Sequence, residues 1–428
     1  MESMPTISVS VAAAATAVAI VVAVSLPYLV KIVDRIYHGI RLEVSLYRAK
    51  KNPNESIVGE VSGVFVYPVK SLRAVSLETS KLDSKGLVDD RRFMVVYELP
   101  LPEWKIQSGE GWTLGETSHR FLTQRQCPSL ATITAKITYD EDKKTEVLVL
   151  SSDKKTMPKK TTKVSIPLSK ESPMSNQVYR AGIWDDTVLV EDMGEGIADF
   201  LREIVDSDDE CLISTTSWTS SSSIRLVRHC VPDRAVDTTY LPNLARTWWG
   251  ASPLVSLTDG FPILLANERS LEDLNGRLKA NNKDTIPMSR FRPNIVIGPL
   301  TKQDDKPQTK TSTDSQKLRP FDEDRWKTIA IGEQLFAIVK GCPRCKQSCT
   351  DQQTGTVYTE PVDTMKSFRR LGVSDGGTSS DDVFFAQNAV PIFRLGQRPT
   401  TTTTTQDSCK ISVGDAVRVL DFGEPIFK

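Results

Sequence analysis

The chain has 428 residues, of which 39% are hydrophobic and 25% charged, and its 54 basic and 54 acidic residues balance to a net charge of zero. It therefore lacks the basic excess of nucleic-acid-coating proteins, while its length allows about two to three domains. Its seven cysteines are odd in number and irregularly spaced, which argues against a secreted disulfide framework and favours a reducing compartment.

The N-terminal segment is predicted to anchor the chain in a membrane. Residues 7–30 carry no charge and are apolar or small throughout, and a bilayer-spanning helix needs about 20 such residues. The alternative, a secretory signal, would begin with basic residues, and none precedes this run. Basic residues follow between Lys31 and Lys51, so the positive-inside rule places the rest of the chain in the cytosol. We expect an uncleaved anchor, with residues 1–54 as anchor and linker.

A first β-barrel-like unit is predicted over residues 55–213. Period-two alternation and β-branched composition predict its strands, which lie at 58–67, 91–97, 130–137 and 145–150. A polar turn at 139–142 joins the last two strands as a pair. Apolar residues at helical spacing predict a helix over 194–205.

A second unit is predicted over residues 214–428, beginning with a Ser/Thr-rich loop at 214–223. Its predicted strands lie at 224–227, 294–297, 335–339 and 416–420, with an amphipathic helix over 269–281. Three polar tracts cannot bury a core and predict surface loops, at 302–317, 374–382 and 398–407. The expected fold is therefore β-rich α+β, with two linked β-barrel domains behind a single transmembrane helix.

Three cysteines gather after the apolar strand at 335–339: Cys342, Cys345 and Cys349. At least one is expected at the end of that strand, where a rigid scaffold presents a ligand to an open site. A structural zinc site would need a second pair of ligands, and the chain has no second Cys-x-x-Cys or His pair. A thioredoxin-like dithiol would place its first cysteine at a helix N-terminus, whereas residues 346–356 are typical of loop and turn.

Two other interpretations of the cluster remain open. The cysteines could be inert and buried, or a single thiolate could hold the metal of a larger cofactor. Arg344 lies beside Cys345, where a guanidinium could lower a thiol pKa and contact an anionic cofactor. The residue types alone do not choose between them.

Further short motifs follow one another in an order that resembles a known family. They are Tyr67-Pro68-Val69-Lys70-Ser71, Asp90-Arg91-Arg92-Phe93, Thr123 to Leu130, Ser270 to Asn275, Phe291 to Val296, Cys342-Pro343-Arg344-Cys345 with Asp351 and Thr354-Gly355, Phe385 to Asn388, and Val413 to Val417. Each is weak by itself, but together they resemble MOSC-domain proteins, and among these the mitochondrial amidoxime-reducing components, from about Ile57 to the C-terminus.

The resemblance implies a molybdenum cofactor, a metal atom on a pterin dithiolene. Cys345 is then the catalytic residue and metal ligand, and Cys342 and Cys349 are not ligands. The matching positions imply that the pterin and its phosphate are bound by Lys70, Ser71, Arg91, Gly260, Phe261, Arg292, Asn294, Pro343, Arg344 and Asn388. Their chemistry agrees, because Lys and Arg pair with phosphate oxygens. Gly260 and Phe261 stand where relatives have small hydroxyl residues, so only backbone contacts are expected there. The segment 123–126 is expected to be structural or to face substrate.

The implied activity is reduction of N-hydroxylated compounds such as amidoximes, hydroxylamines and hydroxamic acids. No dinucleotide, flavin or haem-attachment motif appears in the sequence, so the electrons are expected from partners, which the resemblance implies are cytochrome b5 and its NADH-dependent reductase. The implied location is the outer mitochondrial membrane, with the catalytic part in the cytosol. The alternatives are a cofactor carrier or sulfur-transfer protein without reductase activity, a molybdenum-cofactor sulfurase, whose desulfurase module we do not find here, and a membrane-tethered scaffold with an inert cysteine cluster.

Overall fold

The computed structural model describes most of the chain from residue 57 onward. The described residues are 57–108, 113, 116–142, 144–152, 163–168, 177–208, 210–212, 223–230, 233–237, 241, 253–300, 318–370, 382–393 and 409–424, with Lys51 and scattered helical positions between 26 and 47. Among these residues, no helix combines the length and the apolar character that crossing a bilayer requires. The predicted anchor at 7–30, the loop at 214–223 and the three polar tracts lie almost wholly outside them.

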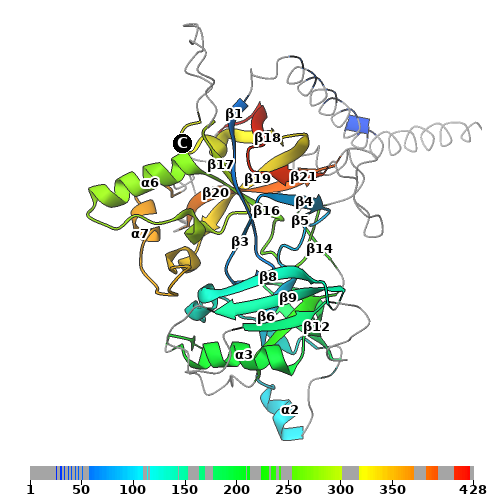
Figure 1. Ribbon diagram of the computed structural model, residues 1–428. Helices are drawn as coiled ribbons and strands as arrows, with labels where there is room; N and C mark the ends of the chain where they lie inside the picture. Colours follow the sequence, from blue (N-terminus) through cyan, green and yellow to red (C-terminus); the bar gives the residue numbers. More distant parts are fainter. Residues whose placement is uncertain are drawn as a thin grey trace, which may run out of the picture.

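The larger barrel forms the upper body in Figure 1. In pairing order its strands are β17 (Ile295–Gly298), β16 (Ile263–Asn267), β20 (Val383–Ile392), β19 (Gln334–Arg344), β18 (Trp326–Ile331), β22 (Ala416–Phe422), β1 (Ile57–Val66) and β3 (Val75–Leu77). An additional antiparallel pairing of β17 with β1 closes the sheet. Gly59 permits this closure, because a Cβ at that position would lie 2.4 Å from the carbonyl oxygen of Gly298.

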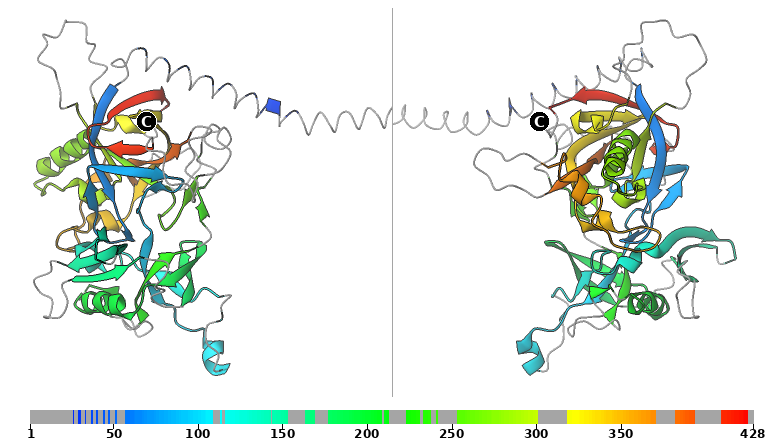
Figure 2. Two further views of the ribbon diagram at one scale, coloured as in Figure 1. Left: turned by 45° about the vertical axis from the view of Figure 1, so that its right-hand side comes forward. Right: turned by 90° about the vertical axis from the view of Figure 1, so that its left-hand side faces the viewer.

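The second barrel lies below the first. Its strands in pairing order are β13 (Arg225–His229), β12 (Asp186–Asp192), β11 (Val178–Ile183), β7 (His119–Phe121), β6 (Phe93–Glu98) and β2 (Val69–Lys70), and pairing of β13 with β6 closes the ring. A separate sheet of β10 (Lys163–Pro167), β9 (Thr145–Ser152) and β8 (Ile133–Asp140) packs beside it. Both views in Figure 2 show the two bodies stacked end to end. The β-rich fold expected from the sequence is confirmed.

Short elements complete the two bodies. The remaining strands are β4 (Thr79–Asp83), β5 (Gly86–Leu87), β14 (Arg234–Ala235), β15 (Leu254–Val255) and β21 (Lys410–Ser412). The helices are α2 (Glu103–Ser108), α3 (Glu195–Asp206), α6 (Glu268–Ala280) and α7 (Val362–Met365), and the 3-10 helices are η1 (Pro128–Thr132), η4 (Met288–Phe291), η6 (Asp322–Arg325) and η7 (Lys346–Cys349). Helices α3 and α6 and the pairing of β8 with β9 agree with the sequence-based expectation. The strand predicted at 130–137 begins later than expected, because residues 130–132 belong to η1 and β8 starts at Ile133.

The sheets cross the predicted division at residues 213 and 214. Strand β1 lies early in the chain but pairs with β17 and β22 of the larger barrel. Strand β13 lies after the division but pairs with β12 and β6 of the smaller barrel. Strand pairing depends on which edges are free in space, and a linear division of the chain does not contain that information. Each barrel therefore contains a strand that the predicted division at residues 213 and 214 placed in the other.

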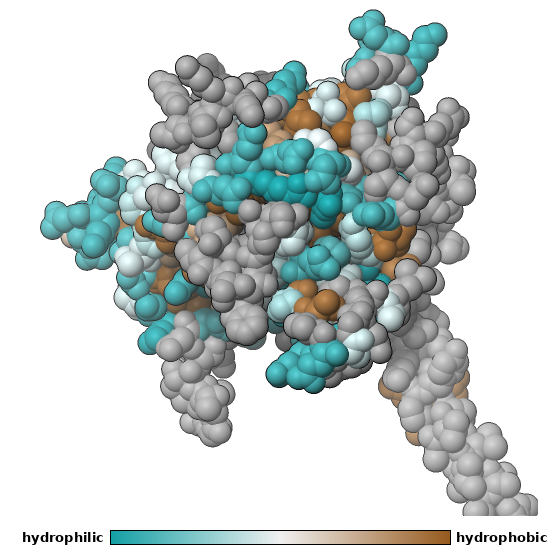
Figure 3. All heavy atoms as spheres, turned by 90° about the horizontal axis from the view of Figure 1, so that it is seen from below, coloured by the Kyte–Doolittle hydropathy of each residue, from teal (hydrophilic) through white to brown (hydrophobic). Residues whose placement is uncertain are grey.

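Each body has its own hydrophobic core. In the smaller one, α3 carries apolar residues at helical spacing, from Ile197 through Phe200 and Leu201 to Ile204, and these pack with Leu148 and its neighbours. In the larger one, Trp326 and Phe336 are buried with the inward residues of β1 and β17. In Figure 3, which shows the molecule from below, the coloured residues form hydrophilic patches with hydrophobic spots between them.

Candidate functional site

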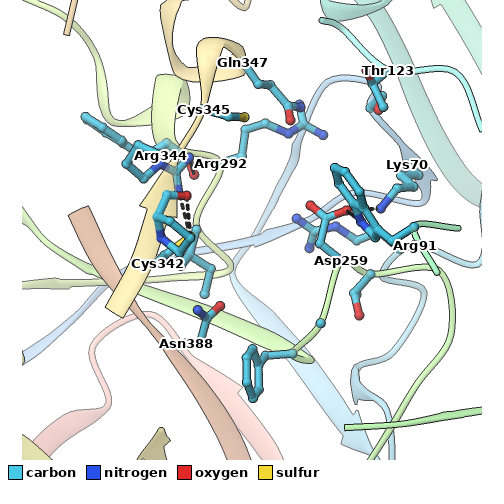
Figure 4. A pocket seen from close by; sticks show the side chains of 18 of the residues that line it. Lys70, Arg91, Thr123, Asp259, Arg292, Cys342, Arg344, Cys345, Gln347 and Asn388 are labelled. Atoms are coloured by element: carbon cyan, nitrogen blue, oxygen red, sulfur yellow. Dashed lines mark hydrogen bonds and ion pairs between the residues drawn. The ribbon is translucent and has the colours of Figure 1, made fainter. Parts of the chain in front are cut away.

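Loops and strand ends of the two bodies converge on a cavity of about 460 Å³ (Figure 4). Every residue predicted from the sequence for the cofactor site lines this cavity: Lys70, Ser71, Arg91, Gly260, Phe261, Arg292, Asn294, Pro343, Arg344, Cys345 and Asn388. They come from β2, the segment before β6, the segments before β16 and β17, the end of β19, and β20. The structure thus brings together positions that span more than 300 residues of the chain; their role in binding a cofactor remains a prediction.

Cys345 presents the accessible thiol of this cavity. Strand β19 ends at Arg344, and Cys345 follows as the N-cap of the single turn η7, where its carbonyl oxygen accepts a hydrogen bond from the Ser348 backbone N–H at 3.1 Å. Its side chain is exposed, whereas Cys349 is buried, lies outside the cavity lining and donates to the Thr359 carbonyl oxygen at 3.3 Å. The strand end therefore delivers one thiol to the open space, as the apolar run at 335–339 predicted.

Cys342 also lines the cavity, but its sulfur accepts a hydrogen bond from a neighbouring arginine. Arg344 Nη1 donates to Cys342 Sγ at 3.0 Å, and Arg344 Nη2 donates to the Phe291 carbonyl oxygen at 3.0 Å. Burial raises the pKa of the Cys342 thiol, and the adjacent guanidinium only partly offsets this. The sequence placed Arg344 beside Cys345, yet in the structure its guanidinium binds Cys342.

A buried lysine contributes to the basic lining. Lys70 Nζ donates to the Leu257 carbonyl oxygen at 2.9 Å and forms an ion pair with Asp259. Burial lowers the pKa of Lys70, and the carboxylate of Asp259 opposes this shift. In total the cavity is lined by six basic side chains and two acidic ones: Lys70, Arg91, Arg125, Arg292, Lys340 and Arg344, against Asp259 and Asp382. Such a lining favours an anionic ligand.

Two arginines are held against the ring of Tyr67. The guanidinium carbons of Arg91 and Arg292 lie 4.2 Å and 4.3 Å from the ring centroid. Arg91 also donates to Asn294 Oδ1 at 3.1 Å and pairs with the buried Asp90. Burial lowers the pKa of Arg292 to about 10 and raises the pKa of Tyr67 to about 12. The aromatic ring and the polar neighbours therefore hold two guanidinium groups in place at the cavity.

The backbone is strained at three of these positions. Ser71, Arg91 and Arg292 have φ values of 69°, 48° and 56°, in the left-handed region that residues with side chains seldom adopt. Arg292 caps η4, and its left-handed conformation turns the chain into β17. Strained residues of this kind cluster at ligand-binding sites, where the surrounding packing compensates for their cost.

The structure adds lining residues that were not predicted from the sequence. They are Thr123, Arg125, Trp184, Thr258, Asp259, Leu264, Phe291, Lys340, Cys342, Gln347 and Asp382. Thr123 and Arg125 belong to the segment 123–126, for which a substrate-side surface was one expectation. Trp184 is the first residue of a two-residue turn between β11 and β12, since Ile183 pairs with Asp186. No local sequence signal distinguishes such a turn residue from any other exposed tryptophan.

Two buried polar atoms at the cavity lack hydrogen-bond partners among the described residues. They are Arg344 Nε and Thr258 Oγ1, and buried polar atoms are rarely left unsatisfied in folded proteins. Gly260 also faces open space, because a Cβ added there would meet no heavy atom within 4 Å. The arrangement therefore provides one accessible thiol, fixed cations and unused hydrogen-bonding atoms around a single cavity. It can hold an anionic organic ligand with a soft metal next to Cys345.

Comparison with known proteins identifies two domain families along the chain. Residues 58–208 match the family described as MOSC N-terminal beta barrel domain, and residues 253–418 match the MOSC domain. The chain is 26% identical to Mitochondrial amidoxime-reducing component 1 of Homo sapiens over 79% of this chain and 84% of that protein. It is 26% identical to Mitochondrial amidoxime reducing component 2 of Bos taurus over 74% of each chain.

A second group of relatives is considerably longer. The chain is 26% identical to Molybdenum cofactor sulfurase of Oryza sativa subsp. japonica over 81% of this chain but 35% of that protein. It therefore spans about a third of the sulfurase's length and most of the length of the amidoxime-reducing components.

Proposed function

Since the chain carries a MOSC N-terminal beta barrel domain and a MOSC domain, it is a MOSC-domain protein, and we propose that it is a molybdenum-cofactor-dependent reductase of N-hydroxylated compounds. One observation carries the proposal: the exposed thiol of Cys345 opens into the same cavity as Lys70 and Arg292. The chain matches the shorter relatives over most of their length, and these relatives are named amidoxime-reducing components, which supports the choice of reaction.

The side chains present fit a pterin-bound metal. The cofactor's phosphate is a dianion that suits the fixed cations Lys70, Arg91 and Arg292. Arg344 Nε and Thr258 Oγ1 offer hydrogen-bonding capacity that the described residues leave unused. Within the described part of the chain, no group of three or more His, Cys, Asp or Glu side chains could hold a metal ion. A metal at Cys345 would accordingly share that one thiolate with ligands that the cofactor brings.

Each residue then has a defined part in the reaction. Overall, two electrons and two protons convert an N-hydroxyl group into an N–H group and release water. The bound cofactor supplies the redox chemistry that removes oxygen from the N–O bond. With the cofactor bound, Cys345 would hold the metal at the strand end, and Lys70, Arg91 and Arg292 would hold the pterin phosphate. Asn388, on β20 beside the cavity, donates to or accepts from the ligand.

Electrons and membrane attachment are supplied from outside the two barrels in this proposal. We propose cytochrome b5 and NADH-cytochrome b5 reductase as the electron donors, because the sequence contains no dinucleotide, flavin or haem-attachment motif. Residues 7–30 are proposed to anchor the chain in the outer mitochondrial membrane with the barrels in the cytosol. The word "mitochondrial" in the names of the shorter relatives supports this location.

The test begins with the cofactor content of the full-length chain. Molybdenum and pterin are measured in the purified protein and in Cys345→Ala, with Cys230→Ala as a control, because Cys230 is half-buried and outside the cavity. Reduction of benzamidoxime is then measured with NADH, cytochrome b5 and its reductase. We expect bound cofactor and turnover in the parent and in Cys230→Ala, and loss of turnover in Cys345→Ala. A parent protein without molybdenum would contradict the proposal.

A cofactor carrier or sulfur-transfer protein is the second candidate. The equal identity of the chain to a molybdenum cofactor sulfurase favours it. The carrier would contain molybdenum and pterin at the same cavity but would not reduce benzamidoxime, and it would transfer its cofactor to an apo-acceptor enzyme. The same preparation therefore separates the two candidates.

A further inference from the structure

Arg125 and Trp184 form one wall of the cavity and have no part in the cofactor site proposed above. The guanidinium carbon of Arg125 lies 4.7 Å from the centroid of the Trp184 indole ring. Arg125 is exposed, and 42% of Trp184 is accessible to solvent, although both residues line the cavity. A cation stacked on an exposed aromatic ring thus borders the open space, and we call this pair the rim wall.

Arg125 has no anionic partner in the described part of the chain. Its backbone N–H donates to Thr123 Oγ1 at 3.3 Å, but its guanidinium takes part in no ion pair or hydrogen bond among those residues. The other arginines of the cavity are engaged, Arg91 with Asp90 and Arg292 with Gln352. A guanidinium that stacks on an aromatic face keeps its N–H edge available for a carboxylate.

Trp184 is fixed in this position by several contacts. Its Nε1 donates to Asp259 Oδ1 at 3.0 Å, and its ring lies 5.2 Å from that of Phe121 in an edge-on arrangement. Its backbone has a φ of 54°, which is costly for a bulky residue and persists only where the surroundings impose it. Arg234 ties the base of the turn to the cavity loop by donating to Asp186 Oδ2 at 2.6 Å and to the Thr258 carbonyl oxygen at 2.8 Å.

The exposure of the rim wall argues for a ligand that enters and leaves. The groups proposed to hold the pterin phosphate include Lys70 and Arg292, which are 6% and 7% exposed, as suits a ligand that stays bound. Figure 4 shows Thr123, which precedes Arg125 by two residues, across the cavity from Cys342 and Arg344. The smaller barrel therefore contributes a wall opposite the end of β19.

We propose that the rim wall selects substrates in which the N-hydroxylated group is attached to a planar aromatic ring that also bears a carboxylate. The ring packs against the indole of Trp184, and Arg125 binds the carboxylate. This inference rests on the proposed reductase function, and it adds the class of substrate.

Two probe compounds test the proposal by binding, independently of turnover. Benzamidoxime and 4-carboxybenzamidoxime differ only in the carboxylate, and their dissociation constants for the full-length holoprotein are measured by calorimetry. We expect the carboxylated compound to bind about tenfold more tightly, as a partly solvated charge-assisted hydrogen bond would give. Arg125→Gln should abolish that preference. Arg120→Gln is the matched control, because Arg120 is exposed on β7 but outside the cavity lining.

Steady-state kinetics and metal content complete the test. In Arg125→Gln, KM for the carboxylated compound should rise about tenfold with kcat nearly unchanged, while both constants for benzamidoxime stay within about twofold of the parent. Trp184→Leu should raise KM for both compounds. Trp184→Phe, which keeps an aromatic ring, should raise KM by less. Equal binding of the two compounds by the parent protein would overturn the proposal. Loss of bound molybdenum in Arg125→Gln would also overturn it, because that result would assign Arg125 to cofactor binding.

Failure of this inference and failure of the proposed function give different results. A parent that reduces both compounds without preferring the carboxylated one refutes the rim-wall proposal and leaves the reductase intact. A parent that binds the carboxylated compound through Arg125 but reduces neither compound refutes the reductase function and retains the binding site. If neither compound binds, the rim-wall proposal is wrong whatever the cofactor does.

Discussion

Gln124 and Gln352 bind each other through both of their side-chain amides. Gln124 Nε2 lies 3.1 Å from Gln352 Oε1, and Gln352 Nε2 lies 2.9 Å from Gln124 Oε1. Gln124 also donates to the Ser71 carbonyl oxygen at 2.7 Å, and Arg292 Nη1 donates to Gln352 Oε1 at 2.9 Å. The pair therefore links two strained residues of the cavity, Ser71 and Arg292, across the boundary between the two barrels.

Removing either amide of this pair should destabilise the protein. Both side chains are buried, so Gln352→Ala leaves donors or acceptors of Gln124 and Arg292 without a partner, at a cost of about 1–3 kcal/mol. Gln124→Ala should lower the free energy of unfolding by a similar amount. The double variant should lower it by less than the sum of the two single effects, because both substitutions break one network. The free energy of unfolding in urea measures this. Gln353→Ala, at the exposed neighbouring position, should stay within about 0.5 kcal/mol of the parent; strict additivity of the pair would show that the two amides act independently.

The cysteines of the cluster should differ in their reaction with iodoacetamide. Cys345 is exposed, whereas Cys349 is buried and Cys342 is half-buried, and burial raises the thiol pKa of both. Because the thiolate is the reactive form, mass spectrometry of the cofactor-free protein should show Cys345 alkylated first. Bound cofactor should protect Cys345. Faster labelling of Cys349 would contradict the orientation of these side chains.

Substitutions at two glycines should distinguish the effect of filling the cavity from the effect of straining the backbone. Gly260→Ala should leave the free energy of unfolding within about 0.5 kcal/mol, because the new Cβ meets no atom within 4 Å. Gly355 has a φ of 78°, and a Cβ there would lie 3.2 Å from the Pro128 carbonyl oxygen, so Gly355→Ala should cost at least about 1–2 kcal/mol. Gly260→Phe should retain the fold but lower the bound molybdenum and pterin. Full cofactor content in that variant would place the ligand elsewhere.

A buried carboxyl group should make stability depend on pH. Burial and the neighbouring Asp324 raise the pKa of Glu323 to about 7, although Ser270 and Asn267 donate hydrogen bonds to it. The folded protein holds this proton up to about pH 7, whereas the unfolded chain releases it near the ordinary pKa of glutamate. The protonated group therefore contributes its full stability below the unfolded pKa, and this contribution disappears as pH rises through the folded pKa.

The variant Glu323→Gln isolates that contribution. Between pH 5 and pH 8 the parent should lose stability relative to Glu323→Gln, by up to about 3 kcal/mol. Thermal unfolding at a series of pH values measures the difference between the two proteins. A difference that does not change with pH would mean that Glu323 does not titrate in this window.

Much of the fold could be predicted locally. Helices α3 and α6 and strands β8, β9 and β22 follow from periodicity, since each buries one face and has polar residues on the other. The site positions that the family resemblance implies, from motifs in fixed order, all line one cavity, but the structure adds further lining residues such as Trp184 that were not predicted. The basic residue types among the implied positions already agree with an anionic ligand. The choice of Cys345 as a metal-binding thiolate over an inert cysteine cluster came only from the resemblance to MOSC-domain proteins.

The tertiary structure decided what those residues contact. Arg344 stands beside Cys345 in sequence, but its guanidinium donates a hydrogen bond to Cys342 Sγ. Gln124 and Gln352 are 228 residues apart, and Arg125 and Trp184 come from different loops of the smaller barrel. The sequence by itself determined which residue types are available and which strands and helices carry them. The partners of each buried amide and guanidinium were decided by strand pairing and barrel closure, because these bring distant segments together and no local pattern records that distance.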